Sequence, residues 1–321
     1  MFEIKLIILM KNLLQRNLPL LLLLLQSCSN DYSSKSYETN NVVILVMDGA
    51  RFTETWGDST HKYIPRLANK AFYSGTVYTK FYNQGPTYTN AGHSAITTGN
   101  YQKIDNTGSE LPLNPSIFQY FLRQSKKDSS KAFVVASKDK LEILTNCSDT
   151  VWRNSFTPMS NCGNNGLGSG YRNDSITFEK AKEIFTAHHP KLVLINFREP
   201  DYSGHANKWD DYINGIKKVD EYVYNLIEYI ENDETYKNKT TYFVTNDHGR
   251  HLDDISTGFS GHGDGCEGCR HINLFAFGPD FKSGAIFERE RELIDVSATT
   301  AELLGFEIPT GKGQIMVELF K

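Results

Sequence analysis

Six side chains in this sequence carry the donor atoms of a transition-metal site. They are Asp48, Asp201, His205, Asp247, His248 and His262. Three carboxylates with three imidazoles suit zinc or another divalent transition ion, because Ca²⁺ and Mg²⁺ prefer shells made only of oxygen. Asp201 and His205 stand four residues apart in DYSGH, so one turn of helix would point both in the same direction.

The acidic members of this set follow strand-like segments that are far apart in the sequence. Asp48 ends the run NVVILVMD, Asp201 comes soon after KLVLINF, and Asp247 closes TTYFVTND. In open α/β sheets ligands bind beyond the carboxyl ends of the strands, so these positions should converge on one edge. Each motif alone has a plainer interpretation. DYSGH could be an ion pair on a helix surface, NDHG a turn capped by its aspartate, and GHGDG a solvated loop. Their joint placement at strand ends favours the metal centre.

A hydroxyl nucleophile is predicted in GPTYTNAGHSAITTGNY, residues 85–101. A helix that starts near Asn90 puts Thr89 at or beside its N-terminus, where free N–H groups and a partial positive charge suit a phosphate. A bound metal ion would activate the hydroxyl by lowering its pKa. The alternatives are that Thr89 only caps the helix, or that Thr87 or Thr97 is the nucleophile.

Alternating strands and helices must position these residues. Buried-strand patterns occupy residues 41–48, 132–137, 191–197, 240–247 and 272–278, and helical patterns occupy 65–75, 174–189, 209–233 and 295–306. Pro65 suits a first helical turn, Gly75 a helix end and Asp174 a cap. The alternation predicts an α/β fold with a mostly parallel central sheet and helices on both faces. We expect one domain over residues 41–321, with the irregular stretch 143–173 as a surface insertion near the site.

The N-terminal segment is typical of an export signal. A polar stretch ending at Arg16 precedes an apolar run, residues 18–25, that is too short to span a bilayer as a helix. The ending LQSC resembles a bacterial lipoprotein signal in which Cys28 would carry the lipid, and an ordinary cleaved signal is the alternative. We therefore expect a signal segment at 1–28 and a flexible tether at 29–40. The protein should be exported, periplasmic or on the outer surface, and anchored to the membrane.

Composition excludes one class of partner and says little of others. The 321-residue chain has a formal net charge of −4 and 39% hydrophobic residues, which fits a globular protein. A mildly acidic balance argues against a surface that coats nucleic acid. The oligomeric state cannot be deduced from the sequence.

Export also changes how the remaining cysteines are interpreted. Cys147, Cys162, Cys266 and Cys269 are even in number, which outside the cytoplasm favours disulfides. A Cys147–Cys162 bridge would close a loop rich in Asn and Gly, and the two cysteines of CEGC could bridge locally. The alternative for CEGC is half of a zinc site, which ranks lower because a second cysteine pair is lacking.

Five ordered blocks resemble a known family. VVILVMDGAR, TNAGHSAITTG, EPDYSGH, NDHGR and GHGDG look like the motifs of the alkaline phosphatase superfamily, in its branch of nucleotide pyrophosphatases/phosphodiesterases and threonine-dependent phosphatases. The blocks lie between residue 42 and about residue 279. The resemblance implies a phosphate-ester substrate and hydrolysis at two zinc ions.

Carried over by position, the resemblance implies one zinc held by Asp48, Thr89, Asp247 and His248. The second zinc would be held by Asp201, His205 and His262. Thr89 would attack phosphorus to form a phospho-threonine, and water activated by the second zinc would then release phosphate. Two such ions can stabilise the attacking and the leaving oxygen of an in-line displacement.

Three further positions match substrate-binding residues of that family. Asn106 matches a residue that holds a phosphate oxygen, and Lys138 and Lys140 resemble a Lys-x-Arg pair of some threonine-dependent phosphomonoesterases. A lysine at the second position loses bidentate clamping, which weakens the monoesterase interpretation. A solvated loop is the alternative for the two lysines. His271 is the alternative to His262 as the last metal ligand.

The predicted function is therefore an exported phosphodiesterase or phosphomonoesterase. A formylglycine sulfatase is disfavoured, because the C/S-x-P-x-R motif is missing and no cysteine lies between Cys28 and Cys147. A phosphomutase is disfavoured by the export signal, and a phosphoethanolamine transferase by the lack of several spanning helices. A non-catalytic surface lipoprotein on the same scaffold is the alternative from another class.

Overall fold

The computed structural model describes residues 36–321, except for the side chains of residues 71–73. Residues Tyr37–Lys321 form one compact unit. The predicted signal segment, the predicted lipidation site at Cys28 and most of the predicted tether lie outside the described residues. Within residues 36–321 no helix has the length and apolarity needed to cross a membrane.

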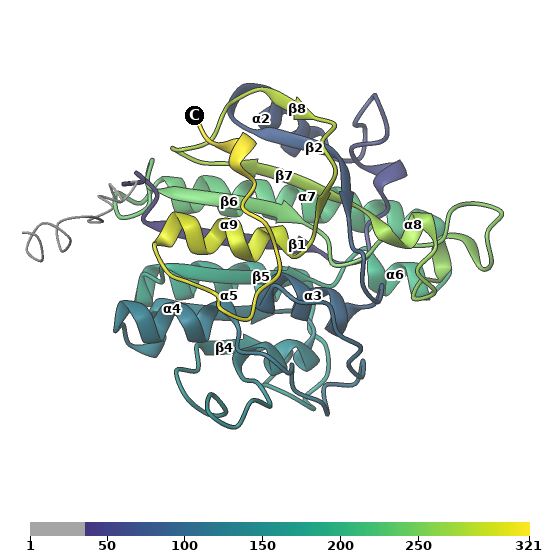
Figure 1. The fold of residues 1–321 in the computed structure, drawn as a ribbon. Helices are drawn as coiled ribbons and strands as arrows, with labels where there is room; N and C mark the ends of the chain where they lie inside the picture. The colour runs from purple at the N-terminus through teal and green to yellow at the C-terminus, as the bar shows by residue number, and fades with distance from the viewer. Residues whose placement is uncertain (1–35) are drawn as a thin grey trace, which may run out of the picture. The chain divides into compact units, whose positions relative to one another are not determined.

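A nine-stranded sheet forms the centre of this unit, in the order β4-β3-β5-β1-β6-β7-β2-β8, with β9 paired to β2 (Figure 1). Its strands are β1 (Asn41–Met47), β2 (Thr76–Tyr82), β3 (Ala132–Ala136), β4 (Met159–Cys162), β5 (Leu192–Phe197), β6 (Thr240–Thr245), β7 (His271–Phe277), β8 (Ala285–Phe287) and β9 (Arg291–Glu292). Only the β6–β7 and β2–β7 pairs are antiparallel. The predicted α/β fold with a mostly parallel sheet is confirmed.

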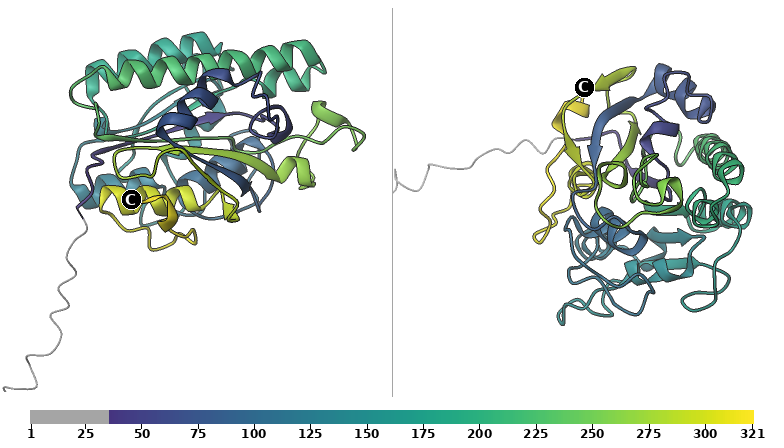
Figure 2. Two further views of the ribbon diagram at one scale, coloured as in Figure 1. Left: turned by 90° about the horizontal axis from the view of Figure 1, so that it is seen from above. Right: turned by 90° about the vertical axis from the view of Figure 1, so that its right-hand side faces the viewer.

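Helices cover both faces of the sheet, with α5 and α7 on one side and α3, α4 and α9 on the other (Figure 2, left). The helices are α2 (Pro65–Ser74), α3 (Thr89–Thr98), α4 (Ile117–Ser125), α5 (Asp174–His188), α6 (Asp201–His205), α7 (Trp209–Glu231), α8 (Glu267–Arg270) and α9 (Asp295–Leu304). Short 3₁₀ turns include η3 (Asp139–Thr145), η4 (Gly258–Ser260) and η5 (Val317–Leu319). Helix α2 begins at Pro65 and is followed by Gly75, as predicted.

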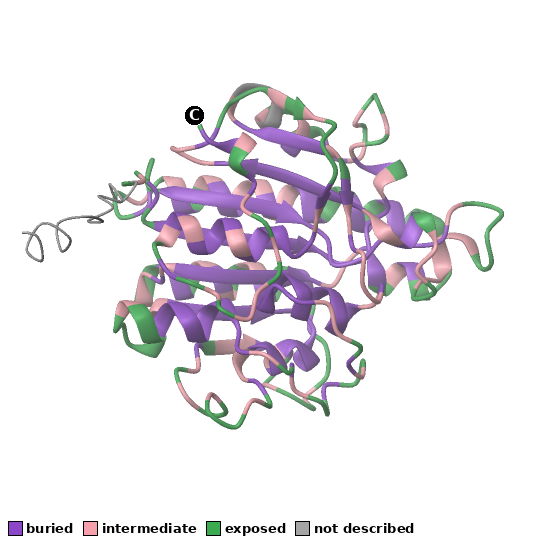
Figure 3. Ribbon diagram, in the orientation of Figure 1, coloured by how far each residue is buried: buried purple, intermediate pink, exposed green. Residues whose placement is uncertain are grey.

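Strand β1 shows why the apolar runs of the sequence are continuous. Val42, Ile44 and Val46 pack into the core with α3, α4 and α9. Their neighbours on the strand point the other way, into the core with α5 and α7. Every residue of β1 is buried. Figure 3 shows that the strands in the middle of the sheet are buried along most of their length. A strand covered on both faces needs apolar side chains at consecutive positions, and this fixes β1 at the centre of the sheet.

Two local predictions are wrong. Asp174 is not the N-cap of α5: the N-cap is Asn173, and the Asp174 carboxylate accepts hydrogen bonds from Ser137 Oγ and the backbone N–H of Arg198. The stretch 143–173 is not wholly irregular, since it includes edge strand β4, which pairs with β3.

The predicted disulfides are also not formed, because all four described cysteines are free thiols. The Cys162 thiol lies in the core at the end of β4, where Sγ donates to the Val134 carbonyl at 3.7 Å. Cys147 is fully buried just after η3.

Candidate metal centre and nucleophile

The seven predicted metal-binding residues lie together beyond the carboxyl ends of the parallel strands. Asp48 follows β1, Asp247 and His248 follow β6, and α6 lies just after β5 at the same end of the sheet (Figure 1). Asp48, Asp201 and His248 have ligand atoms within 4.8 Å of one another, and so do Asp201, His205 and His262. Asp201 belongs to both groups, so the two adjoin.

His248 presents a lone pair to two carboxylates. The ring is fully buried, and its Nδ1 lies 2.8 Å from the Gly249 carbonyl, to which it must donate. Nε2 therefore carries no proton, although it lies 3.6 Å from Asp48 Oδ1 and 3.4 Å from Asp247 Oδ2. Burial lowers the pKa of His248 to about 3, so the ring is neutral. Nε2 and Asp247 Oδ2 are both buried without a hydrogen-bond partner, which fits a cation between them.

A second group forms around Asp201. His262 Nδ1 donates to the Thr87 carbonyl at 2.9 Å, which frees Nε2 to face the group. That Nε2 lies 3.0 Å from His205 Nε2, and both atoms lie 3.4 Å from Asp201 Oδ1. Helix α6 is the single turn predicted from DYSGH, and it carries both Asp201 and His205 on one side. Two imidazoles facing one carboxylate oxygen form a donor set typical of zinc.

Lys138 places an ammonium group among the carboxylates. Its Nζ lies 2.8 Å from Asp48 Oδ1, 2.7 Å from Asp201 Oδ2 and 3.1 Å from Thr89 Oγ1. Burial alone would lower the pKa of Lys138, but Asp201 and Asp48 raise it above its ordinary value. Burial likewise opposes ionisation of Asp201, yet Lys138, His262 and Arg250 hold its pKa well below the usual range. The site therefore binds positive charge in the structure.

Thr89 is the hydroxyl that faces this charge. It is the first residue of α3, whose N-cap is Tyr88, and it is buried. Thr97 instead turns its hydroxyl back to the carbonyl of His93, within the helix. Thr87 Oγ1 accepts a hydrogen bond from the backbone of Gly265. Of the three candidate nucleophiles, Thr89 alone contacts Lys138 and begins the helix.

Two predicted substrate-binding residues lie beside Thr89. Asn106 Oδ1 accepts hydrogen bonds from the backbone N–H of Asn90 at 3.0 Å and from Lys140 Nζ at 2.9 Å. Burial and the charge of Lys138 lower the pKa of Lys140 to about 8. Asn106 is exposed whereas both lysines are buried, and Lys138 Nζ contacts Thr89 Oγ1. The solvated-loop alternative for the two lysines does not hold.

His271 lies apart from both groups. It opens β7, where its Nε2 donates to the Thr79 carbonyl at 2.8 Å. Its ring stacks on Phe52 at 3.9 Å and on Tyr82 at 4.9 Å between centroids. The structure brings His262, and not His271, to Asp201.

Three residues of the site escaped the sequence analysis. His93 lies one turn after Thr89, with Nδ1 2.9 Å from the Thr89 carbonyl and Nε2 3.1 Å from Asn196 Nδ2. Asn196 also donates to Asp48 Oδ2 at 2.9 Å. Arg250 is fully buried and donates to Asp201 Oδ1 and to the Ser260 carbonyl. The signal for His93 was its four-residue spacing from Thr89, and for Arg250 its place two residues after His248.

One family model matches the chain. It describes type I phosphodiesterases/nucleotide pyrophosphatases and matches residues 42–251, which is more than half of the chain. The matched range runs from β1 through Thr89 and α6 to the segment after His248. No curated protein sequence gives a match.

Solved structures share the fold. Murine ectonucleotide pyrophosphatase/phosphodiesterase 5 aligns with a TM-score of 0.62 and 15% identity, over 88% of this chain and 100% of that chain. An inactive variant of that mouse protein, with a threonine replaced by alanine, has been solved in complex with AMP. A Vibrio parahaemolyticus protein of the alkaline phosphatase superfamily aligns with a TM-score of 0.63 and 15% identity, over 90% and 72% of the two chains. The PsFucS1 sulfatase from Pseudoalteromonas sp. reaches 0.64 at 15% identity, over 88% and 72%.

Proposed function

Because this chain belongs to the type I phosphodiesterase/nucleotide pyrophosphatase family, within the alkaline phosphatase superfamily, we propose that it hydrolyses phosphodiesters with Thr89 as nucleophile. Two zinc ions are its proposed cofactors, with other divalent transition ions as substitutes. Asp48, Asp247, His248 and Thr89 would hold one, and Asp201, His205 and His262 the other.

The main support for this proposal is the position of Thr89 Oγ1. It lies 3.1 Å from the Lys138 ammonium, which also contacts Asp48 and Asp201. A cation stabilised there is adjacent to the hydroxyl, and α3 directs the partial positive charge of its N-terminus to the same place. Divalent ions at these ligands would supply the charge that lowers the hydroxyl pKa and neutralises the phosphate. Nε2 of His248 faces Asp48 and Asp247, and Nε2 of His262 faces Asp201.

In the proposed reaction, Thr89 Oγ gives up its proton and forms a bond to phosphorus. The bond from phosphorus to the leaving alkoxide breaks, and the leaving group departs as an alcohol after taking up a proton. Water then attacks the phospho-threonine, which restores Thr89 and releases the phosphate product. Asn106, Lys140 and Lys138 would contact the non-bridging phosphate oxygens, and cations bound to Asp48 and Asp201 would release the Lys138 ammonium from these carboxylates.

Two observations favour a diester over a monoester substrate. The family model describes phosphodiesterases and nucleotide pyrophosphatases, and it covers the whole nucleophile region. Lys140 also lies 2.9 Å from Asn106 as a single-point donor, without the fork that an arginine would give a dianionic phosphate. The AMP complex of the murine protein supports a nucleotide as one candidate product.

Thr89→Ala tests the proposal with Thr97→Ala as the matched control, since both are hydroxyl residues of α3. Turnover of bis-(4-nitrophenyl) phosphate should fall by more than about 10³-fold in Thr89→Ala and change little in Thr97→Ala. Circular dichroism should stay near wild type in both, and Thr89→Ala should keep most of its zinc because the other proposed ligands remain. Full turnover by Thr89→Ala would exclude a threonyl intermediate. Faster turnover of 4-nitrophenyl phosphate than of the diester would select the monoesterase.

A further inference from the structure

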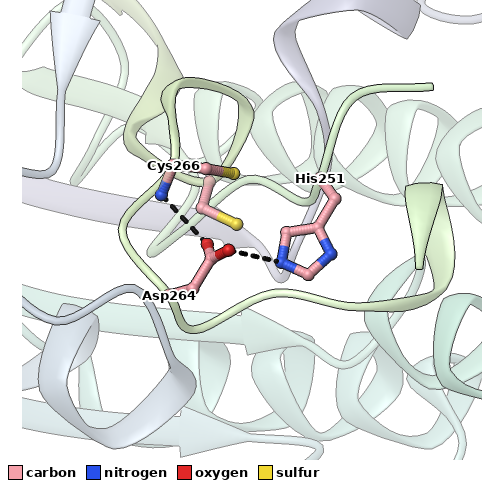
Figure 4. A group of neighbouring side chains, drawn as sticks. His251, Asp264 and Cys266 are labelled. Atoms are coloured by element: carbon pink, nitrogen blue, oxygen red, sulfur yellow. Dashed lines mark hydrogen bonds and ion pairs between the residues drawn. The ribbon is translucent and has the colours of Figure 1, made fainter. Parts of the chain in front are cut away.

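A second group of metal-ligating side chains lies outside the proposed catalytic centre. It consists of His251, Asp264, Cys266 and Cys269, whose ligand atoms all lie within 4.8 Å of one another. None of the seven residues assigned to the catalytic zinc ions belongs to it. Figure 4 shows His251 and the Cys266 side chain turned toward Asp264 from separate parts of the chain.

The imidazole of His251 is oriented as a ligand. The residue is only 5% exposed, and its Nδ1 lies 3.1 Å from Thr257 Oγ1, a hydrogen bond that fixes the ring. Its Nε2 is buried without a hydrogen-bond partner, although Asp264 Oδ2 lies 3.3 Å away. A buried ring nitrogen that faces a carboxylate and two thiols, with the other nitrogen held by a neighbour, has the arrangement of a metal-bound histidine.

The backbone holds the other three ligands in place. Asp264 Oδ1 accepts a hydrogen bond from Cys266 N at 3.0 Å, and Cys269 N donates to the Cys266 carbonyl at 3.0 Å. The turn is pressed against the chain after β6, where Gly249 N donates to the Cys269 carbonyl. Gly268 lies between the two cysteines, and a Cβ there would come within 2.5 Å of the Arg250 carbonyl oxygen. Only glycine therefore lets the turn lie this close to the backbone of Arg250.

We propose that His251, Asp264, Cys266 and Cys269 bind one structural zinc ion. Two thiolates, an imidazole and a carboxylate make a complete tetrahedral shell, which is typical of a structural rather than a catalytic zinc site. The sulfur ligands select zinc over Ca²⁺ or Mg²⁺. The CEGC turn is thus one half of a site whose other half comes from His251 and Asp264.

The competing arrangement is a disulfide between Cys266 and Cys269. Both thiols are free in the structure, and Cys269 is fully buried. A disulfide would consume both sulfurs and leave Asp264 Oδ2, at 3.3 Å, as the one group of the four that still faces His251 Nε2. A zinc ion uses all four groups, so it accounts for more of the observed arrangement.

The position of this zinc suggests what it stabilises. His251 follows His248 by three residues, and Asp264 follows His262 by two. The backbone N–H of His251 also donates to the Gly261 carbonyl at 2.9 Å. The ion would therefore tie the end of β6 to the loop that carries His262, and hold that loop against Asp201.

Cobalt substitution tests the site independently of turnover. Thiolate-bound Co²⁺ absorbs in the near ultraviolet by charge transfer, and the proposed catalytic ligands include no cysteine, so this band reports on the second site alone. The reduced full chain loaded with Co²⁺ should show the band. Cys266→Ser/Cys269→Ser should lose it together with one metal equivalent per chain. The matched control Cys147→Ser/Cys162→Ser should keep both.

Two further variants separate the outcomes. Asp48→Asn/Asp247→Asn should lose metal from the catalytic centre yet keep the band, so failure of the proposed function would leave this result intact. If the double variant does not fold, Cys266→Ser alone serves as the test. It changes only the half-buried sulfur and should weaken the band. The proposal is overturned if the wild type shows no band, if the band survives in Cys266→Ser/Cys269→Ser, or if the chain isolated without oxidant carries a Cys266–Cys269 disulfide.

Discussion

At the scale of single residues, proton positions decide what the site can bind. His248 donates Nδ1–H to a backbone carbonyl, so it presents an unprotonated Nε2 inward. Asp48 and Asp201 face the same space, and Lys138 supplies the only ammonium among these described ligands. An imidazole lone pair beside buried carboxylates is stabilised by added positive charge. The proposed metal binding would therefore depend on the tautomer of His248.

His262→Ala and His271→Ala separate the two candidates for the last metal ligand. His262→Ala should lose about one metal equivalent per chain, because it removes one of two imidazoles that face Asp201. His271→Ala should keep full metal content and lose its ring stacking and its hydrogen bond to the Thr79 carbonyl, about 1–2 kcal/mol. Plasma mass spectrometry of the dialysed proteins measures both. Metal loss in His271→Ala with retention in His262→Ala would reverse the assignment.

At the scale of elements, the C-terminal segment is joined to the edge of the sheet by an ion pair. Arg291 of β9 contacts Glu318 of η5 at 2.6 Å, and Tyr78 of β2 donates to the same carboxylate at 2.9 Å. Burial alone would raise the pKa of Glu318, but the hydrogen bonds from Arg291 and Tyr78 lower it from 4.5 to about 2. The carboxylate is therefore more acidic in the folded chain than in the unfolded chain.

Glu318→Gln should lower stability in a pH-dependent way. A depressed carboxyl pKa contributes stability above the unfolded value of 4.5, and this contribution disappears as pH falls toward about 2. The variant should lose about 1–2 kcal/mol at neutral pH, after allowance for solvent screening. The difference in free energy of unfolding between wild type and variant, measured with urea, should narrow as the pH falls from about 5 to about 3. Glu288→Gln, an exposed glutamate of the same region, is the control, and an equal loss at all pH values would contradict the ion-pair account.

At the scale of the whole molecule, the proposed metal ligands tie together parts of the chain that are far apart in sequence. Asp48 follows β1, Asp201 lies in α6, and His248 follows β6. His262 lies in the loop between η4 and α8. Two ions that bind these ligands in the folded state, and few of them in the unfolded chain, would stabilise the fold by mass action.

Removal of metal should therefore lower the stability of the entire unit. Zinc at about 100 to 1,000 times its Kd should add about 3–4 kcal/mol per independent site over the chelated protein. The urea midpoint should rise with zinc and return after chelation. Magnesium serves as the control, because it prefers oxygen ligands and should have a much smaller effect. An unchanged midpoint in zinc would argue against binding at the folded centre.

The sequence by itself determined most of the elements and most of the proposed metal ligands. Apolar runs at β1 and β6 mark strands buried on both faces, so Asp48 and Asp247 had to end at one edge of the sheet. DYSGH places Asp201 and His205 one helical turn apart, and Thr89 begins α3 as its spacing indicates. These conclusions depend only on local periodicity and on the geometry of parallel sheets.

Only the tertiary structure decided which distant groups meet. His262 rather than His271 reaches Asp201 because the loop before α8 folds back over α6, whereas β7 carries His271 away between two aromatic rings. The pairing of Cys266 and Cys269 with His251 was likewise hidden, because residues fifteen or more positions apart in irregular segments have no periodicity that predicts their contact. Contacts of this kind are set by the packing of the whole chain, since no local pattern of residues specifies them.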